Sequence, residues 1–253
     1  MSNSGEGQQR GTSFGSNAAA YAEHRPDYPR EAIEWALAPL SGRGQLTVLD
    51  LGAGTGQLTR GLLDLGAKVL AVEPDARMRS ELVRSHPTVG AHPGTAEEIP
   101  LPDASVDAVL VGNAFHWFDQ ERAFPEIARV LRPGGVAAAL WNDDDARADW
   151  IAGLAEIFGW GKTASPVERV RQHPLFKDLE HTDFRHGQRS TTDSMVARMG
   201  TLSPVLALPE QERVELLDRI RRHLNTHPDT EKGEFDLPIV TSVTRAELRG
   251  ANG

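Results

Sequence analysis

The chain has no cysteine among its 253 residues, which excludes disulfide bonds, thiol nucleophiles and metal sites built on thiolates. Positive charge is also scarce, since 27 Lys and Arg residues face 36 Asp and Glu residues and the formal net charge is −9. Because nucleic-acid binders usually present a basic face, we expect no nucleic-acid partner. The nine histidines are scattered without the short spacings of metal ligands, so we expect no metal.

Long apolar segments are missing as well. No run approaches the ~20 apolar residues that cross a bilayer. The polar N-terminal stretch, residues 1–11, lacks the apolar region of a signal peptide. We therefore expect a cytoplasmic protein with no membrane partner. With 39% hydrophobic residues the chain is large enough to bury one core, and we expect a monomer or a homodimer.

The most informative stretch of the sequence is residues 48–57. An apolar run carries Asp50 near its end and leads into a turn with glycines at 52, 54 and 56. Apolar residues at helical spacing then follow, namely Leu58, Leu62 and Leu65. This pattern predicts a strand, a tight turn and a helix. Glycine lets the backbone turn sharply and approach a ligand, and the N-terminus of a helix favours an anionic group.

Two classes of ligand use such a turn. A dinucleotide-binding turn needs Gly or Ala at its sixth position, where this chain has Gln57. The pattern Asp50-x-Gly52-x-Gly54-x-Gly56 instead resembles motif I of the class I methyltransferases that use S-adenosylmethionine. The resemblance implies that the methionyl part of this cofactor lies against the loop that carries Asp50, Gly52, Ala53, Gly54 and Gly56. The alternative is a glycine-rich turn without a ligand.

A second buried strand is predicted over residues 68–73 and ends at Glu73, 21 residues beyond Gly52. A carboxylate at this end of a strand can accept both hydroxyls of an adenosine ribose, with Pro74 beside it. The alternative is an acid that faces solvent. Met78 lies in the helix predicted to follow, where it could approach the adenine or pack in the core.

The loop after the third predicted strand, residues 88–92, contains Thr95, Ala96 and Glu97. In the resembling family a loop at this place holds the edge of the adenine, commonly through an aspartate followed by a small residue. Thr95 stands at the aspartate position, and a hydroxyl accepts a hydrogen bond more weakly than a carboxylate. The resemblance therefore implies a cofactor contact at these three residues, carried partly by the backbone N–H of Ala96.

A fourth buried strand is predicted over residues 106–111, and polar and aromatic residues follow its carboxyl end. Ligands of open α/β sheets bind outside such ends. Asn113, Ala114 and Trp117 resemble motif IV of the family, which implies contact with the cofactor. Trp117 could attract the sulfonium through its ring face or pack in the core. His116 is the candidate general base, and the alternative is a residue that only shapes the wall.

The N-terminal part of the chain divides into two predicted segments. Residues 1–13 are rich in Ser, Gly, Gln and Asn and are predicted to be disordered. Residues 14–30 resemble the N-terminal signature of a subgroup that includes trans-aconitate methyltransferase-like enzymes, in which this segment folds over the cofactor. Tyr21 and Arg25 are the implied contacts. The alternative is a structural clasp in which Tyr21 and Tyr28 pack on the core.

Three more strands are predicted over residues 136–140, 184–190 and 238–243. The first follows a predicted turn, Arg132-Pro133-Gly134-Gly135, which also resembles the family. We expect an α/β fold, and the resemblance implies a Rossmann-like, seven-stranded, mostly parallel sheet with strand seven antiparallel and helices on both faces. Residues 14–253 would form one methyltransferase domain, with a helical cap from insertions around 143–180 and 191–232.

The resemblance implies transfer of a methyl group from S-adenosylmethionine to a small-molecule acceptor, with S-adenosylhomocysteine as product. We expect a partly apolar acceptor because the predicted cap is rich in large apolar side chains, namely Trp150, Phe158, Trp160, Met195 and Met199. Two alternatives stay open. One is a protein that binds S-adenosylmethionine without catalysis. The other is a dinucleotide-dependent oxidoreductase, which Gln57 and the lack of a second binding half disfavour.

Overall fold

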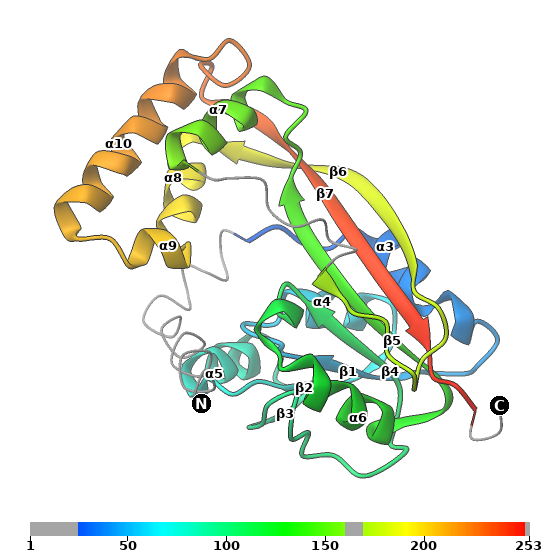
Figure 1. The fold of residues 1–253 in the computed structure, drawn as a ribbon. Helices are drawn as coiled ribbons and strands as arrows, with labels where there is room; N and C mark the ends of the chain where they lie inside the picture. Colours follow the sequence, from blue (N-terminus) through cyan, green and yellow to red (C-terminus); the bar gives the residue numbers. More distant parts are fainter. Residues whose placement is uncertain (1–24, 160–168, 251–253) are drawn as a thin grey trace.

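The computed structural model describes residues 25–159 and 169–250, and its centre is a twisted seven-stranded sheet in the order β3-β2-β1-β4-β5-β7-β6 (Figure 1). Strands β1 to β5 pair in parallel, and β7 is antiparallel to both of its neighbours. The predicted fold class is therefore confirmed. The strands are β1 Thr47–Leu51, β2 Lys68–Val72, β3 Gly90–His92, β4 Val106–Gly112, β5 Leu131–Asp144, β6 Glu180–Thr191 and β7 Glu234–Glu247.

Helices cover both faces of the sheet, as expected for strands that are apolar on both sides. One face packs against α3 Arg30–Leu37, α4 Gln57–Asp64 and α5 Ala76–Ser85, with the short η2 Ala38–Leu40 after α3. The opposite face packs against α6 Gln120–Val130, which follows the short η3 Phe115–Trp117. These two layers form the main hydrophobic core.

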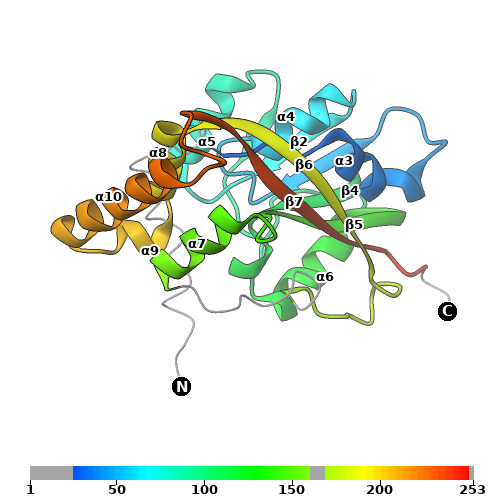
Figure 2. The same cartoon turned by 90° about the horizontal axis from the view of Figure 1, so that it is seen from above.

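Strands β5, β7 and β6 form a long arm at one side of the sheet (Figure 1). The pairing of β4 with β5 ends at Gly112 and Leu140, whereas β5 continues to pair with β7 as far as Asp144 and Ile239. The arm therefore projects beyond the carboxyl end of β4. The remaining helices lie at the end of this arm (Figure 2), namely α7 Asp149–Phe158, α8 Thr192–Gly200, α9 Ser203–Leu206 and α10 Glu210–Thr226.

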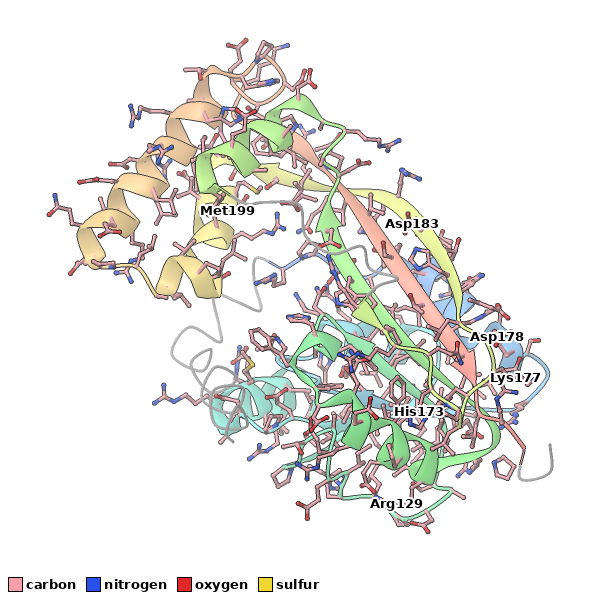
Figure 3. All side chains as sticks on the ribbon, in the orientation of Figure 1. Arg129, His173, Lys177, Asp178, Asp183 and Met199 are labelled. Carbon is pink, nitrogen blue, oxygen red and sulfur yellow. The ribbon has the colours of Figure 1, made fainter. Side chains whose placement is uncertain are left out.

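The cap helices have their own hydrophobic core. Trp150 of α7 packs on Phe235 of β7 with ring centroids 5.2 Å apart, and Met195 and Met199 of α8 are buried in the same cluster. Figure 3 shows Met199 among these helices, away from the lower half of the sheet. Alternating apolar residues at the start of β7 close this cluster, which explains why the helices dock on the arm.

The predicted cap segment 143–180 differs from the structure at both ends. Asp143 and Asp144 continue β5, because their backbones pair with Val240 and Ile239 of β7, and the helix begins only at Asp149. Val170 and Phe176 are buried against α6 in the main core. The described helical part of this segment is therefore α7 alone. Trp160 lies outside the described residues.

The predicted start of the fifth strand, after a turn at Arg132 to Gly135, is wrong. The structure includes these residues in β5, which begins at Leu131. The pairing with β4 shifts register between Val106 and Ala108, and Gly134 has φ +68°. The chain therefore turns within the strand as an irregularity of the ladder, which glycine permits without strain.

The topology creates a crevice at the middle of the sheet. From β1 the chain continues to β2 and β3 on one side, and β4 then lies on the other side of β1. The loops after β1 and β4 therefore leave the sheet in opposite directions. In open α/β sheets the carboxyl ends of such neighbouring strands form the binding crevice.

The contact between α3 and α4 gives a test of the packing. A Cβ added at Gly61 of α4 would lie 2.4 Å from Cδ1 of the buried Ile33. Alanine at this position gains ~1 kcal/mol of helix propensity, but overpacking costs ~1–3 kcal/mol. We expect Gly61→Ala to lower the free energy of unfolding, and Ile33→Val, which lacks Cδ1, to relieve the clash.

Urea denaturation of the two single variants and the double variant measures this coupling. We expect the double variant to be more stable than the sum of the single effects by ~1 kcal/mol. Additivity of the two substitutions within ~0.3–0.5 kcal/mol would show that α4 shifts instead of meeting Ile33.

Candidate functional site

The glycine turn after β1 is built on three left-handed backbone positions. Gly52, Gly54 and Gly56 have φ values of +70°, +57° and +96°. A Cβ at Gly52 would lie 2.9 Å from Cβ of Ala114, so the loops after β1 and β4 touch there. Gly56 is the N-cap residue of α4. The first N–H groups of the helix therefore have no partner within it and face the turn. Only glycine supplies this backbone without steric cost.

A cavity opens over this turn, with about 920 Å³ of empty space that includes a part open to solvent. Its walls come from the loops after β1, β2 and β4 and from the segment before α3. Most of the predicted site residues line it, namely Arg25, Asp50, Gly52, Ala53, Gly54, Glu73, Pro74, Met78, Asn113, Ala114 and Trp117.

Asp50 lies at the floor of this cavity and has no contact with solvent. It is 0% exposed, and its Oδ2 accepts a 2.6 Å hydrogen bond from the hydroxyl of Thr59. Its Oδ1 has no hydrogen-bond partner among the described residues, and neither has the hydroxyl of Thr55. Burial, and then repulsion from Glu73, raise the pKa of Asp50 to about 7. Buried polar atoms without a partner are rare, so these two mark places for a polar ligand.

Glu73 lies at the end of β2, where its carboxylate bridges two loops. One oxygen accepts from the N–H of Gly54 at 2.9 Å and the other from the N–H of Asp75 at 2.8 Å. Burial raises the pKa of Glu73, and these two N–H donors oppose the shift. Each carboxylate oxygen accepts more than one hydrogen bond, so both retain a free lone pair that a ligand hydroxyl can use.

Residues 25–29, which we call the strap, cross the side of the cavity before α3. Gln57 at the start of α4 donates to the carbonyl of Arg25 at 3.0 Å, and Arg60 pairs with Asp27. Tyr28 is 7% exposed, and its hydroxyl lies where a Cβ at Gly112 would stand, at 2.7 Å. This part of the predicted segment 14–30 is attached to the core, and Tyr21 lies outside the described residues.

The carboxyl end of β4 provides the opposite wall. Asn113 has φ +51°, a left-handed conformation that asparagine tolerates better than most residues. Its N–H donates to the carbonyl of Leu140 at 2.8 Å, and its Oδ1 accepts from the N–H of Asn142 at 3.1 Å. These bonds to β5 hold the strained residue at the cavity. Trp117 is 41% exposed and lines the mouth.

His116 is outside the group of residues that line the cavity. Its ring packs on Trp117, with centroids 4.8 Å apart, and the residue as a whole is exposed. Partial burial of the ring and, less strongly, the charge of Arg169 lower the pKa of His116 to about 4. The ring is therefore neutral at pH 7.

The loop after β3 does not reach the cavity in the structure. Ala96 is buried in the main core, and Glu97 accepts a 2.8 Å hydrogen bond from the N–H of Asp119 before α6. Thr95 makes a backbone bridge with Glu98. Gly56, although part of the turn, is also outside the lining residues, because it faces His86, the residue that follows α5.

The cavity also contains residues that the sequence did not identify, namely Pro26, Tyr28, Thr55, Gln57, Leu58, Gly112 and Phe118. Thr55, Gln57 and Leu58 lie inside or next to the glycine motif, so their position in the sequence was a usable signal. Gly112 has no left-handed φ. Glycine is needed there because a Cβ would collide with the ring of Tyr28, and no local sequence pattern indicates that contact.

Other kinds of site find less support in the described residues. Among residues 25–159 and 169–250 no group of three or more His, Asp or Glu side chains lies close enough to hold a metal ion. None of the helices in this part of the chain combines the length and the apolar character needed to cross a membrane.

Comparison with known proteins identifies the family. The methyltransferase domain model matches residues 49–139. An uncharacterised methyltransferase of Mycobacterium tuberculosis is 43% identical over 238 residues, which cover 93% of this chain and 96% of that protein. A second, from Schizosaccharomyces pombe, is 30% identical over 248 residues, covering 91% of this chain and 95% of that one.

A solved structure agrees with these sequence matches. The putative type II methyltransferase of Anaeromyxobacter dehalogenans has a TM-score of 0.67 and 29% identity, and the match covers 89% of this chain and 97% of that one. The chain belongs to the class I methyltransferases, the enzymes that use S-adenosylmethionine as methyl donor.

The raised pKa of Asp50 gives a stability prediction. The native state holds a proton on Asp50 below pH 7, whereas the unfolded chain releases it near pH 3.8. Stability therefore falls as the pH rises between these values, by ~2–3 kcal/mol from pH 5 to pH 8. Asp50→Asn keeps an acceptor for Thr59 without the charge, so its stability relative to the wild type should grow over this range.

Thermal unfolding of the ligand-free proteins at pH 5, 6, 7 and 8 measures this difference. Asp64→Asn, which changes an exposed acid of α4, is the matched control and should show no such trend. A constant difference in stability between Asp50→Asn and the wild type across the range would mean that Asp50 does not carry the shifted ionisation.

Proposed function

We propose that the protein transfers the methyl group of S-adenosylmethionine to a small-molecule acceptor and releases S-adenosylhomocysteine. The observation that carries this proposal is the cavity over the glycine turn, whose floor holds the partnerless Oδ1 of Asp50. A buried carboxylate oxygen in an open cavity suits the amino group of a methionyl ligand. The family membership supplies the cofactor, and the cavity offers donors and acceptors for both of its ends.

The residues fit this cofactor as follows. Asp50 and Thr55, with the N–H groups at the start of α4, would hold the amino acid part, since they offer an acceptor and donors side by side. Glu73 would accept the ribose hydroxyls through its two free lone pairs. Met78, buried beside the turn, supplies an apolar surface for the adenine.

Thr95, Ala96 and Glu97 have less support as adenine contacts. They lie outside the lining residues, and the side chain of Glu97 is already bonded to the backbone of Asp119. If they take part, the backbone N–H of Ala96 is the available donor, because its side chain is buried in the core. Tyr21 and Arg25 stay proposed contacts from the N-terminal segment, and Arg25 lines the cavity.

For methyl transfer the protein mainly has to align the acceptor with the methyl group. The cofactor supplies a methyl group on a positively charged sulfur, so the methyl is activated before the acceptor arrives. Holding two reactants in line can contribute ~7–11 kcal/mol. The described walls that can do this are the fixed loop at Asn113, the exposed ring of Trp117 and the strap. The ring face of Trp117 also favours a neighbouring cation.

An acceptor with an apolar part is supported by the mouth of the cavity rather than by the cap. Trp117 and Phe118 line the mouth and present ring surfaces. Three of the cap residues that suggested an apolar acceptor, Trp150, Met195 and Met199, are at most 3% exposed and fill the core of the cap, whereas Phe158 is only partly buried there. The three buried residues are therefore not available to a ligand.

The direct test uses the purified wild-type protein with S-adenosylmethionine, S-adenosylhomocysteine and NAD. We expect both S-adenosyl compounds to raise the melting temperature and NAD to leave it unchanged. Formation of S-adenosylhomocysteine in the presence of a panel of small acceptors then reports catalysis. Stabilisation by NAD alone would overturn the proposal, and tight binding without turnover of any acceptor would favour a binding protein.

Glu73 gives the sharpest prediction for the cofactor site. Glu73→Ala leaves buried ligand hydroxyls without an acceptor, which costs ~1–3 kcal/mol. We expect the affinity for S-adenosylhomocysteine to fall about tenfold or more, measured by calorimetry. Glu34→Ala, which removes an exposed acid of α3, should bind as the wild type does.

A second variant separates binding from loop structure. Glu73→Ala also removes the acceptor of the Gly54 and Asp75 N–H groups, whereas Glu73→Gln keeps one acceptor oxygen. We expect Glu73→Gln to lose less stability and still bind more weakly than the wild type. Unchanged affinity in both variants would remove Glu73 from the site.

His116 is better supported as a residue that packs behind the wall residue Trp117 than as the general base. Its ring supports Trp117, lies outside the cavity lining and is a weak base because its pKa is lowered. We expect His116→Asn to change turnover only in step with cofactor affinity. A loss of turnover of ~10²–10⁴-fold with unchanged affinity would instead identify His116 as the base predicted from the sequence.

A further inference from the structure

Asn142 of β5 is the centre of a polar network beside the cavity. Its backbone N–H donates to Oδ1 of Asn113, which lines the cavity at the end of β4. Its side-chain amide donates two hydrogen bonds of 3.1 Å, to the carbonyls of Pro26 and Asp27 in the strap. Thr241 of β7 donates to its Oδ1 at 2.5 Å. One residue therefore joins the strap, β4 and β7.

The direction of every bond in this network is determined. The two strap carbonyls accept only, so the NH₂ group of Asn142 must face them and its Oδ1 must face Thr241. Thr241 therefore donates its hydroxyl hydrogen to Asn142. The 2.8 Å contact between Thr241 and Nε2 of His186 must then be a donation from the histidine. The chain of donors runs from His186 through Thr241 and Asn142 to the strap.

The strap is an irregular part of the cavity wall. Residues 25–29 form no helix or strand, and Arg25, Pro26 and Tyr28 all line the cavity. Gln57 and Arg60 of α4 also hold the strap, through the carbonyl of Arg25 and the carboxylate of Asp27. Asn142 is thus the attachment on the β5 side, opposite to α4. Without its amide, the strap loses two hydrogen bonds to β5 and keeps the packing of Tyr28 and the bonds to α4.

We propose that Asn142 is a positioning residue for the cofactor site, which acts by fixing the strap and the loop at Asn113 in one arrangement. The inference rests on the proposed function. Asn142 is outside the residues that line the cavity, so its effect on binding passes through Pro26, Asp27 and Asn113. A pre-organised wall binds its ligand more tightly, because less ordering is left for the binding step. The side chain thus sets cofactor affinity without touching the cofactor.

The chain offers a matched control for a purely structural asparagine. Asn225 of α10 is bonded to the hydroxyl of Thr192 at 3.2 Å within the cap. It forms the same kind of asparagine–threonine contact, but it joins two cap helices and lies outside the cavity lining. Loss of either asparagine removes a hydrogen bond to a threonine. Only loss of Asn142 releases the strap.

The test compares Asn142→Ala, Asn142→Asp and Asn225→Ala as full-length proteins at a temperature where all are folded. We expect the affinity for S-adenosylhomocysteine, measured by calorimetry, to fall about tenfold for both Asn142 variants, because two hydrogen bonds to the strap are lost. Asn142→Asp keeps an acceptor for Thr241 but cannot donate to the carbonyls. Asn225→Ala should bind as the wild type does, whatever its melting temperature.

Hydrogen exchange without any ligand tests the same mechanism independently of the proposed function. Exchange in peptides covering residues 25–33 and 113–118 should become faster in Asn142→Ala by about tenfold, and stay unchanged in Asn225→Ala. Thr241→Val should show a smaller increase in the exchange rate of these peptides. Thr241→Ser should exchange as the wild type does, because serine keeps the hydroxyl.

Two results would overturn the inference. One is unchanged exchange of the strap in Asn142→Ala, which would mean that α4 alone holds it. The other is wild-type affinity in the Asn142 variants although the strap exchanges faster. If the wild type itself binds no S-adenosylhomocysteine, the proposed function fails, and the exchange data still report whether Asn142 fixes the strap.

Discussion

A buried carboxylate at the end of the central strand is the constraint on which the site depends. Asp50 has no contact with solvent, one hydrogen bond from Thr59 and one oxygen without a partner. Such a group costs free energy in the ligand-free protein, and burial raises its pKa because the charged form is the one penalised. The surrounding fold has to supply this free energy. A ligand with a donor or a positive charge at that oxygen recovers part of this free energy, which favours binding.

The second acid shows how the turn is kept in place around that carboxylate. Glu73 draws the N–H of Gly54 towards β2, so that the turn after β1 is closed by a side chain from the next strand. The positive φ values of the three glycines allow the backbone to follow. The same carboxylate thus stabilises the loop and presents its remaining lone pairs to the cavity. Its loop role and its proposed role in binding therefore share the same atoms, which is why the amide variant is more informative than alanine.

The part of the site that was predictable is the part encoded in short sequence spacing. Asp50 and the glycines lie within one strand, turn and helix, and Glu73 ends the next strand, so their convergence follows from the parallel topology. Asn142 meets Pro26 from 116 residues away, and no local pattern indicates such a pair. The length of β5 was missed for a similar reason, since Asp143 and Asp144 belong to a strand only because β7 pairs with them. At His116 the position after β4 was right, but whether its side chain reaches the cavity depends on packing with Trp117.

The last residues of β5 connect the cavity to the cap. Asn142 and Asp144 are two residues apart and therefore share a face of the strand. The first is bonded to the strap, and the second pairs with Arg198 of α8 at 2.7 Å, an arginine whose side chain is 9% exposed. A buried ion pair of this kind is costly to break, because separation leaves a charge without its partner. The strap and α8 are thus anchored close together on a part of β5 that is paired with β7, from Val136 to Asp144. The strap and the cap therefore depend on neighbouring residues of the same strand, although their hydrophobic cores are separate.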